Sequence, residues 1–305
     1  MSATLVRPVI STTSTSPTTA APAAGYGLLG AGLFLLGGGL ALLSALGPLL
    51  LGVIDYRVTA TYRNETIGLD AVSLALVAPA AIAVGILSLR RHASAPVLAL
   101  GPAAYSAYML VQYVLGPQYL RLPGNNERFF LLYLALFVLA GAIGVHAWNS
   151  IDLERLPTPN ARRARLLGRF MLPLVAVAVF ARYIPALLDA TSRTPTAADY
   201  AAGPTFFWTI ALLDLGIGLP TLVAACVGLL RGRAWASKAL WLVVGWLALV
   251  GPAVAGMATA MYINDDPNAS LSLLALMGSL AIGLVALAVF VYKPLLTARA
   301  ALAGT

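Results

Sequence analysis

Eight long apolar runs restrict the fold of this chain more than any other feature of its sequence. A membrane-spanning helix needs about 20 apolar residues. Inside lipid the backbone must satisfy its own hydrogen bonds, so each run should be helical. The sequence therefore predicts an all-α, polytopic membrane helix bundle of about eight transmembrane helices. The runs are Tyr26–Ile54, Leu69–Leu89, Ala95–Pro117, Phe129–Trp148, Phe170–Ala190, Thr205–Leu230, Ala239–Tyr262 and Leu271–Leu296.

The composition argues against a soluble fold. Of the 305 residues, 60% are hydrophobic and only 10% are charged, whereas about a quarter of a soluble domain is charged. A soluble protein could not hide this much apolar surface, and a bilayer removes the need to do so. The only cysteine, Cys226, excludes an intrachain disulfide and any CxxC redox or zinc motif.

The basic residues fall unevenly on the two sides of the predicted bundle. Cytoplasmic loops carry an excess of Lys and Arg, so the 13-to-6 split places both termini in the cytoplasm. Because these residues lie in short loops, the net charge of +8 does not indicate a nucleic-acid partner. The preference for Arg and Ala suggests a bacterial cytoplasmic membrane. The smaller group is Arg57, Arg63, Arg121, Arg128, Arg182 and Arg193, and the outer loops are Asp55–Gly68, Gln118–Arg128, Thr191–Pro204 and Ile263–Ser270.

Five segments follow from these patterns. Residues 1–25, rich in Ser, Thr, Pro and Ala, are expected to be a disordered cytoplasmic tail. Residues 26–148 hold the first four helices and residues 170–296 the last four. A basic cytoplasmic loop, 149–169, separates them, and residues 297–305 form a cytoplasmic tail.

Two stretches of the chain resemble each other. Leu69–Gly101 reads LDAVSLALVAPAAIAVGILSLRRHASAPVLALG, and Leu213–Gly245 reads LDLGIGLPTLVAACVGLLRGRAWASKALWLVVG. Both contain Leu-Asp, a proline, a basic turn, Ala-Ser and a second apolar run. The pattern indicates two four-helix repeats in parallel orientation, although any two Ala- and Leu-rich hairpins with arginine turns look alike. In this alignment Asp70 matches Asp214.

Arg182 and Asp214 are charged residues that lie deep inside the predicted spans, so each needs a partner. Arg182 lies 12 residues after Phe170, about 18 Å from the cytoplasmic start of its span. Asp214 lies 16 residues before Leu230, about 24 Å from the cytoplasmic end. The short outer loop between these spans makes them neighbours, so we predict an Arg182–Asp214 ion pair in the outer half of the bundle.

Further polar side chains converge on the same outer half. Tyr105, Tyr108 and Gln112 share one helical stripe. These side chains could line a polar pocket open to the outside. Alternatively, the tyrosines belong to an interfacial aromatic belt, and the ion pair only holds helices together. The candidate binding residues are Asp70, Ser73, Tyr105, Tyr108, Gln112, Tyr133, Arg182 and Asp214.

Other features bear on packing and cofactors. Small residues recur every fourth position at Gly37, Ala41 and Ala45 and at Ala275, Ser279 and Gly283. Such faces let helices approach closely, within the bundle or in a homodimer. The histidines, His92 and His146, both fall near the cytoplasmic face, and no metal-binding or catalytic motif is visible. We therefore expect no cofactor and no metal.

Four short motifs of biased composition stand out: YRNETIGLDAVSL from Tyr62, AYSAYMLVQY from Ala104, NNERFFLLYLALF from Asn125 and LDLGIGLPTLVAACVGLLRGRAWA from Leu213. Through these motifs, most of the region between Tyr62 and Tyr262 resembles a group of uncharacterised bacterial multi-pass membrane proteins. The Ser/Thr/Pro tail of this chain is longer than is usual in that group. The resemblance implies no activity.

Three functions compete. Kinked helices, a repeat and embedded charges favour a carrier of a small solute or ion with an outward-facing polar pocket. The small-residue faces and the near absence of a soluble domain favour a membrane sensor or an accessory subunit that binds a lipid or a partner protein. A membrane enzyme acting on a lipid or quinone is the third, because no nucleophile–base pair is visible. The ligand is not indicated.

Overall fold

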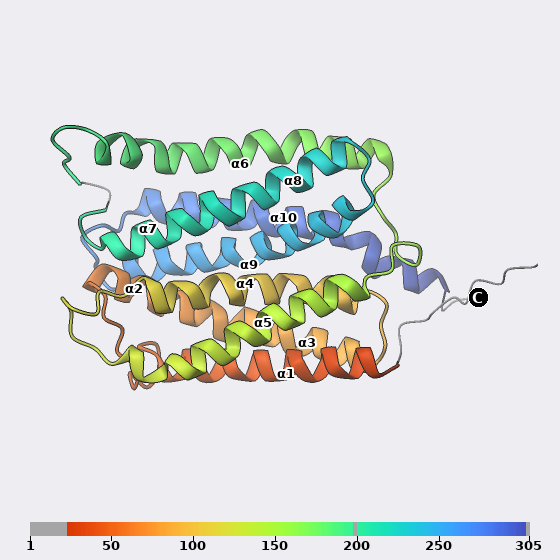
Figure 1. Cartoon of the computed structure of the whole chain (residues 1–305), viewed down its shortest axis with the longest axis horizontal. Helices are drawn as coiled ribbons and strands as arrows, with labels where there is room; N and C mark the ends of the chain where they lie inside the picture. The colour runs from red at the N-terminus through yellow and green to blue at the C-terminus, as the bar shows by residue number, and fades with distance from the viewer. Residues whose placement is uncertain (1–22, 198–199, 303–305) are drawn as a thin grey trace, which may run out of the picture.

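The computed structural model describes residues 23–197 and 200–302, and they form an all-α bundle (Figure 1). The predicted tail therefore lies almost wholly outside the described residues, as do residues 303–305. The long helices run side by side along the bundle axis. In chain order the elements are α1 (Ala23–Leu46), α2 (Ala60–Val72), η1 (Ser73–Val77), α3 (Ala78–Leu89), α4 (Ala95–Leu115), η2 (Asn126–Phe129), α5 (Phe130–Ser150), α6 (Ala161–Ala190), α7 (Pro204–Leu213), η3 (Asp214–Gly218), α8 (Leu219–Leu230), α9 (Trp235–Ile263) and α10 (Leu271–Leu302).

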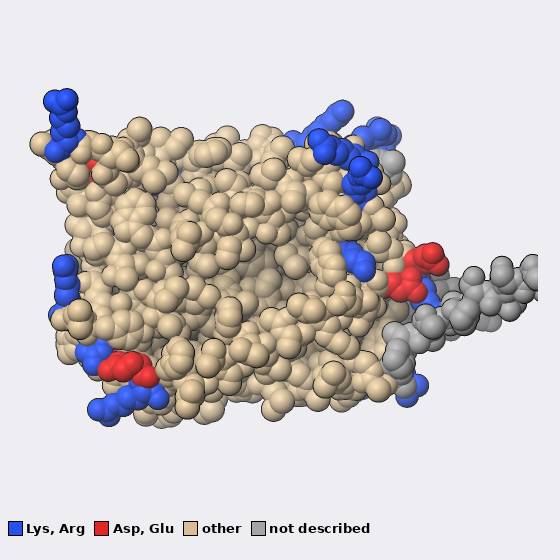
Figure 2. Space-filling model, viewed as in Figure 1, with Lys and Arg blue, Asp and Glu red and all other residues tan. Residues whose placement is uncertain are grey.

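Seven helical segments among the described residues are long and apolar enough to cross a membrane. The chain is therefore a multi-pass membrane protein, and the prediction of a helical membrane bundle is confirmed. The remaining predicted span lies within α6, which runs along the edge of the bundle in Figure 1; its crossing of the membrane stays a prediction. Figure 2 shows charged residues gathered at the two ends of the visible face, while a broad central band shows none.

Helices α4 and α9 form the centre of the bundle. α4 contacts α3, α5, α7 and α9, and α9 contacts α2, α4, α8 and α10. The two central helices cross where Gly101 meets Gly245: a Cβ atom on Gly101 would lie 3.0 Å from the Gly245 carbonyl oxygen. Glycine at this crossing lets the two backbones touch. The central helix α4 also carries Tyr105 and Tyr108, two of the three tyrosines among the candidate binding residues.

Several helix boundaries differ from the predicted ones. α1 ends at Leu46, because Gly47 and Pro48 cannot continue a helix well. α2 begins at Ala60, so the second half of the predicted outer loop Asp55–Gly68 is helical. α6 begins at Ala161, inside the predicted basic loop, where the Asn160 side chain accepts a hydrogen bond from the Arg163 N–H at 2.9 Å.

Two of the long helices are broken in the same way. α2 continues through a π-helical turn, η1, into α3, and α7 continues through the π-helical turn η3 into α8. Pro79 and Pro220 each follow two residues after the turn and remove one helix hydrogen bond, which the wider turn accommodates. Each helix ends before a left-handed residue, Arg91 (φ 54°) or Gly232 (φ 66°).

This shared element changes the alignment of the two stretches. Matching the prolines and the π-turns places Ser73, not Asp70, opposite Asp214. The prediction that Asp70 and Asp214 are equivalent positions is therefore not supported by the helix geometry. The likeness concerns two broken helices and does not show a repeat of the whole four-helix half.

The two small-residue faces have different surroundings. On α1, a Cβ atom at Gly37 would lie 2.8 Å from the Ile82 side chain of α3, so this face packs inside the chain. On α10, Ala275, Ser279 and Gly283 are exposed. A homodimer through the α10 face stays a prediction.

Candidate functional site

The predicted polar residues form two clusters on different sides of α4 instead of one pocket. Tyr105 and Tyr113 point toward α2 and η1, whereas Tyr108 points toward η3. Tyr108 and Tyr113 are five residues apart, which is about 140° around an α-helix. The Asp70 cluster comprises Ser44, Tyr56, Asp70, Ser73, Tyr105, Tyr113 and Tyr133, and the Asp214 cluster comprises Tyr62, Glu65, Tyr108, Arg182, Tyr183 and Asp214.

Asp70 is fully enclosed, with an exposed fraction of 0%. Its Oδ1 accepts a hydrogen bond from the Tyr113 hydroxyl at 3.1 Å, while its Oδ2 has no hydrogen-bond partner among the described residues. Oδ2 lies so close to Gly47 that a Cβ atom there would overlap it. Burying a carboxylate without satisfying both oxygens is costly, so this group requires an explanation beyond packing.

Three stacked tyrosines surround this carboxylate. The Tyr113 ring lies between those of Tyr56 and Tyr133, with centroid distances of 5.1 and 6.1 Å. The Tyr56 and Tyr133 hydroxyls lie near each other, yet neither makes a hydrogen bond of normal geometry. Beside them, Ser73 and Tyr105 satisfy each other at 3.0 Å. Within the part of the chain that the structure describes, three buried oxygen atoms of this cluster therefore have no hydrogen-bond partner.

A clamp between two loops closes the end of the bundle next to Tyr56. The Arg57 guanidinium contacts the Glu127 carboxylate at 2.6 Å and donates to the Leu122 carbonyl at 2.8 Å. Its hydrogen bond to Glu127 raises the pKa of Arg57. Asn125 adds bonds in both directions, accepting from the Asp55 N–H and donating to the Val53 carbonyl. These contacts hold the residues after α1 against those before α5.

Asp214 is satisfied by two phenols and not by an arginine. Its Oδ1 accepts from the Tyr108 hydroxyl and its Oδ2 from the Tyr183 hydroxyl, both at 2.5 Å. The predicted Arg182–Asp214 ion pair is not among the ion pairs of the described residues, which are Arg57–Glu127 and Arg155–Asp152. The prediction failed because neutral phenols reach the carboxylate from two helices and occupy both oxygens.

Arg182 lies beside this carboxylate without being bound to it. Its guanidinium carbon is 5.4 Å from the centre of the Tyr183 ring, and it interacts electrostatically with both Asp214 and Glu65. The side chain is exposed. This cation therefore interacts with two acids and with the Tyr183 phenol, and its exposed guanidinium has five N–H groups to offer.

The outer part of the Asp214 cluster has its own small apolar core. Tyr183 and Ala186 of α6 pack against Phe207 and Ala211 of α7, separately from the main core of the bundle. Apart from α8, α6 has few neighbours. On the inner side, the centre of the Trp246 ring lies 5.3 Å from that of Tyr108, and its buried indole N–H has no hydrogen-bond partner in residues 23–197 and 200–302. The Asp214 cluster is thus bordered on one side by α6, which has few neighbours, and on the other by the Trp246 indole N–H.

Sequence reasoning selected most of these residues but missed some. Gln112 joins neither cluster: its amide contacts the Met109 sulfur at 3.5 Å. Tyr113 and Tyr56 were missed, because Tyr113 lies off the predicted stripe and Tyr56 lies in a loop. Spacing alone could not have revealed Tyr113, because eight residues leave it about 80° from Tyr105 around an α-helix, further than Tyr108.

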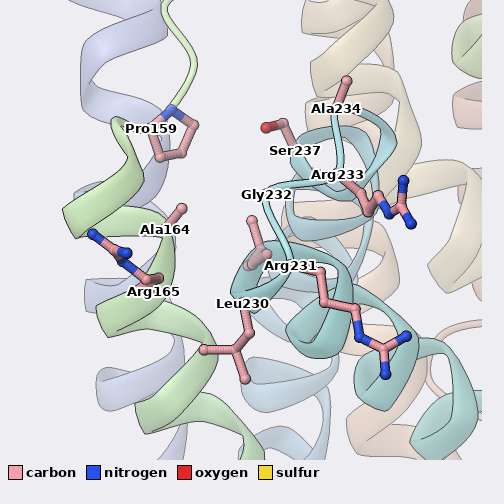
Figure 3. A pocket seen from close by; sticks show the side chains of 10 residues that line it. Pro159, Ala164, Arg165, Leu230, Arg231, Gly232, Arg233, Ala234 and Ser237 are labelled. Carbon is pink, nitrogen blue, oxygen red and sulfur yellow. The ribbon is translucent and has the colours of Figure 1, made fainter.

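Two cavities among the described residues lie at the opposite end of the bundle. A cavity of about 430 Å³ opens between the start of α6 and the α8–α9 turn (Figure 3), and one of about 160 Å³ lies next to it. None of the eight predicted binding residues lines either cavity. In Figure 3 the guanidinium groups of Arg231 and Arg233 point away from α6, so they do not converge on a ligand between the elements. No group of three or more His, Cys, Asp or Glu in the described ranges is placed to hold a metal ion.

No protein-family model matches the chain, and neither a curated protein nor a solved structure matches it. The resemblance to bacterial multi-pass membrane proteins thus names no family.

Proposed function

We propose that this multi-pass membrane protein carries a small polar solute, which binds in the Asp214 cluster. The observation that supports this best is the state of Arg182. Phenols occupy both oxygens of Asp214, so the guanidinium is left exposed between two acids in a mostly apolar bundle. Charged residues inside membrane bundles mark solute or ion pathways. A residue that only held helices together would be paired with the nearest carboxylate.

The chemistry of the cluster indicates the kind of solute. The guanidinium of Arg182 suits a carboxylate or a phosphate, which it can bind through two N–H groups. Glu65 and the unpartnered indole N–H of Trp246 offer an acceptor and a donor for a second polar group. A small molecule carrying an anionic group and a donor group, such as an amino acid, meets all three.

The broken helices support a carrier as well. In carriers, discontinuous helices often form the binding site, and η3 begins at Asp214 itself. Within this proposal the chain has eight crossings including α6, two four-helix halves and both termini in the cytoplasm of a bacterial cell. The exposed α10 face would contact a second copy.

The test is a thermal-shift screen of the purified, full-length chain. A panel of amino acids, small carboxylates and small phosphates is compared on the wild type, Arg182→Ala and Arg169→Ala. Arg169 is the matched control, since it is an exposed arginine at the other end of the same helix. We expect at least one compound to raise the melting temperature of the wild type and of Arg169→Ala, but not that of Arg182→Ala.

The screen is followed by uptake of the compound into proteoliposomes. Saturable uptake that Arg182→Ala abolishes supports the carrier. A compound that stabilises Arg182→Ala as much as the wild type contradicts the site. Binding without uptake contradicts transport and favours the sensor or accessory subunit.

A further inference from the structure

We infer that the Asp70 cluster binds one desolvated monovalent cation of the size of sodium. The cluster lies on the other side of α4 from the proposed solute site, and none of its residues contacts Arg182. The inference rests on three features: unpartnered oxygen atoms, the end of a helix, and the absence of a protein cation.

The unpartnered oxygens are unusually well enclosed. Asp70, Tyr56 and Tyr133 have exposed fractions of 0%, 5% and 1%, and each has an oxygen atom without a hydrogen-bond partner among the described residues. Both tyrosines lie within electrostatic reach of the Asp70 carboxylate. Buried polar atoms are almost always satisfied by protein, water or an ion, so three in one cluster point to a bound partner.

The end of α1 makes this position attractive for a positive charge. Asp70 Oδ2 lies against Gly47, directly after the last residue of α1, where the helix dipole is negative. The Ser44 side chain adjoins the same carboxylate. Pro48, four residues after Ser44, has no N–H to offer the Ser44 carbonyl. Helix end and carboxylate therefore add their negative potentials.

No basic side chain compensates for this charge. Within the described ranges, neither of the two ion pairs involves Asp70. A single carboxylate with neutral hydroxyl oxygens suits a hard cation of one charge, because sites for divalent ions add further carboxylates. A proton on Oδ2 would satisfy one oxygen and leave the two phenols unpartnered. A bound cation would instead offer a partner both to the carboxylate oxygen and to the phenol oxygens.

The cation site has a distinct role if the proposed function holds. An ion bound in a closed cluster next to a solute site can couple the two binding events, since α4 contributes Tyr105 and Tyr113 to one and Tyr108 to the other. The coupling rests on the proposed function, whereas the binding of the cation does not.

The test measures the melting temperature of the purified, full-length chain as sodium chloride replaces choline chloride at constant ionic strength and one fixed pH. We expect a saturable rise with sodium that potassium chloride does not reproduce. Asp70→Asn should abolish it. Asp214→Asn is the matched control and should keep it.

A second pair of variants keeps the test decisive even if Asp70→Asn does not fold. Tyr133→Phe and Tyr56→Phe each remove one oxygen atom and should weaken sodium about 2- to 10-fold. Wild type that does not respond to sodium, or a response that survives Asp70→Asn, overturns the inference. If the melting temperature depends on pH but not on sodium, the inference is also overturned, and a proton at Asp70 is identified instead. Arg182→Ala should leave the sodium response intact while abolishing solute binding, so failure of either proposal is seen separately.

Discussion

Asp70 and Asp214 belong to two helices that are broken in the same way, by a π-helical turn. The Asp70 carboxylate is enclosed, whereas the Asp214 carboxylate is only half-buried. Asp70 precedes the π-turn by three residues, is fully buried and has one unpartnered oxygen. Asp214 begins its π-turn, is half-buried and has both oxygens satisfied. The same helix break thus supports two kinds of site.

The difference comes from the neighbours of each helix break. The Asp70 cluster is closed by the Arg57–Glu127 clamp and by the end of α1. The Asp214 cluster is bordered by α6, whose outer half packs in a separate small core. Asp70 is therefore enclosed, as the proposed ion site requires, whereas Arg182 is exposed at the edge of the bundle, as the proposed solute site requires.

The largest expected effect is on the unfolding free energy of two variants, each of which removes one tyrosine hydroxyl from one of the two carboxylates. Tyr113→Phe removes the hydroxyl that donates to Asp70 Oδ1, and it should cost about 3 kcal/mol of unfolding free energy in mixed micelles, because a buried charged acceptor is left unsatisfied. Tyr183→Phe leaves Asp214 with Tyr108 and should cost about 1 kcal/mol. Equal losses would show that enclosure does not distinguish the clusters.

The next effect concerns the space at Gly47. A Cβ atom in Gly47→Ala overlaps Asp70 Oδ2, so the substitution should cost about 1–3 kcal/mol and weaken the sodium response. Gly38→Ala on the same helix is the control, since a Cβ atom there meets open space; it should be neutral or stabilising by up to about 1 kcal/mol. A neutral Gly47→Ala contradicts the tight fit.

A smaller effect is expected at Arg182. Because it makes no ion pair and lies 5.4 Å from the Tyr183 ring centre, Arg182→Ala should change the unfolding free energy by less than about 1 kcal/mol. Its effect should appear in ligand binding instead. A loss of several kcal/mol without ligand would favour the alternative in which Arg182 only holds helices together.

Much of the fold could be predicted from the sequence, because long apolar runs leave few alternatives in a bilayer. The π-turns could not, since they depend on how α2 and α7 pack around Pro79 and Pro220. That the candidate residues bind a ligand stays a prediction, but the single pocket expected for them is replaced by two clusters. A linear stripe on α4 does not reveal that Tyr105 and Tyr108 face different helices. Nor does spacing reveal that phenols displace an arginine from Asp214.

The smallest effect is a pH dependence at the loop after α9. Burial would raise the pKa of Asp266, but hydrogen bonds from the Asn268 N–H, Asn64 and Thr61 outweigh it and lower the pKa below its ordinary 3.8. A lowered pKa stabilises the fold above that value, and this stability is lost as the pH falls through the lowered pKa. The melting temperature should therefore fall in acid.

Asp266→Asn should flatten this acid dependence. The neighbouring, exposed Asp265→Asn is the matched control and should leave it unchanged. An equal acid dependence in Asp266→Asn and the wild type would mean that Asp266 does not stabilise this loop.

The central claim is that the Asp214 cluster is open to water from outside while the Asp70 cluster is closed. It is tested most directly by a membrane-impermeant thiol reagent on intact cells, with single cysteines in a Cys226→Ala background. We expect Arg182→Cys to react, and Ser44→Cys, which replaces a buried residue, to stay unmodified. Val177→Cys, on the same helix and exposed to lipid in the proposed topology, should also stay unmodified. Rapid modification of Ser44→Cys, or none of Arg182→Cys, would contradict the account.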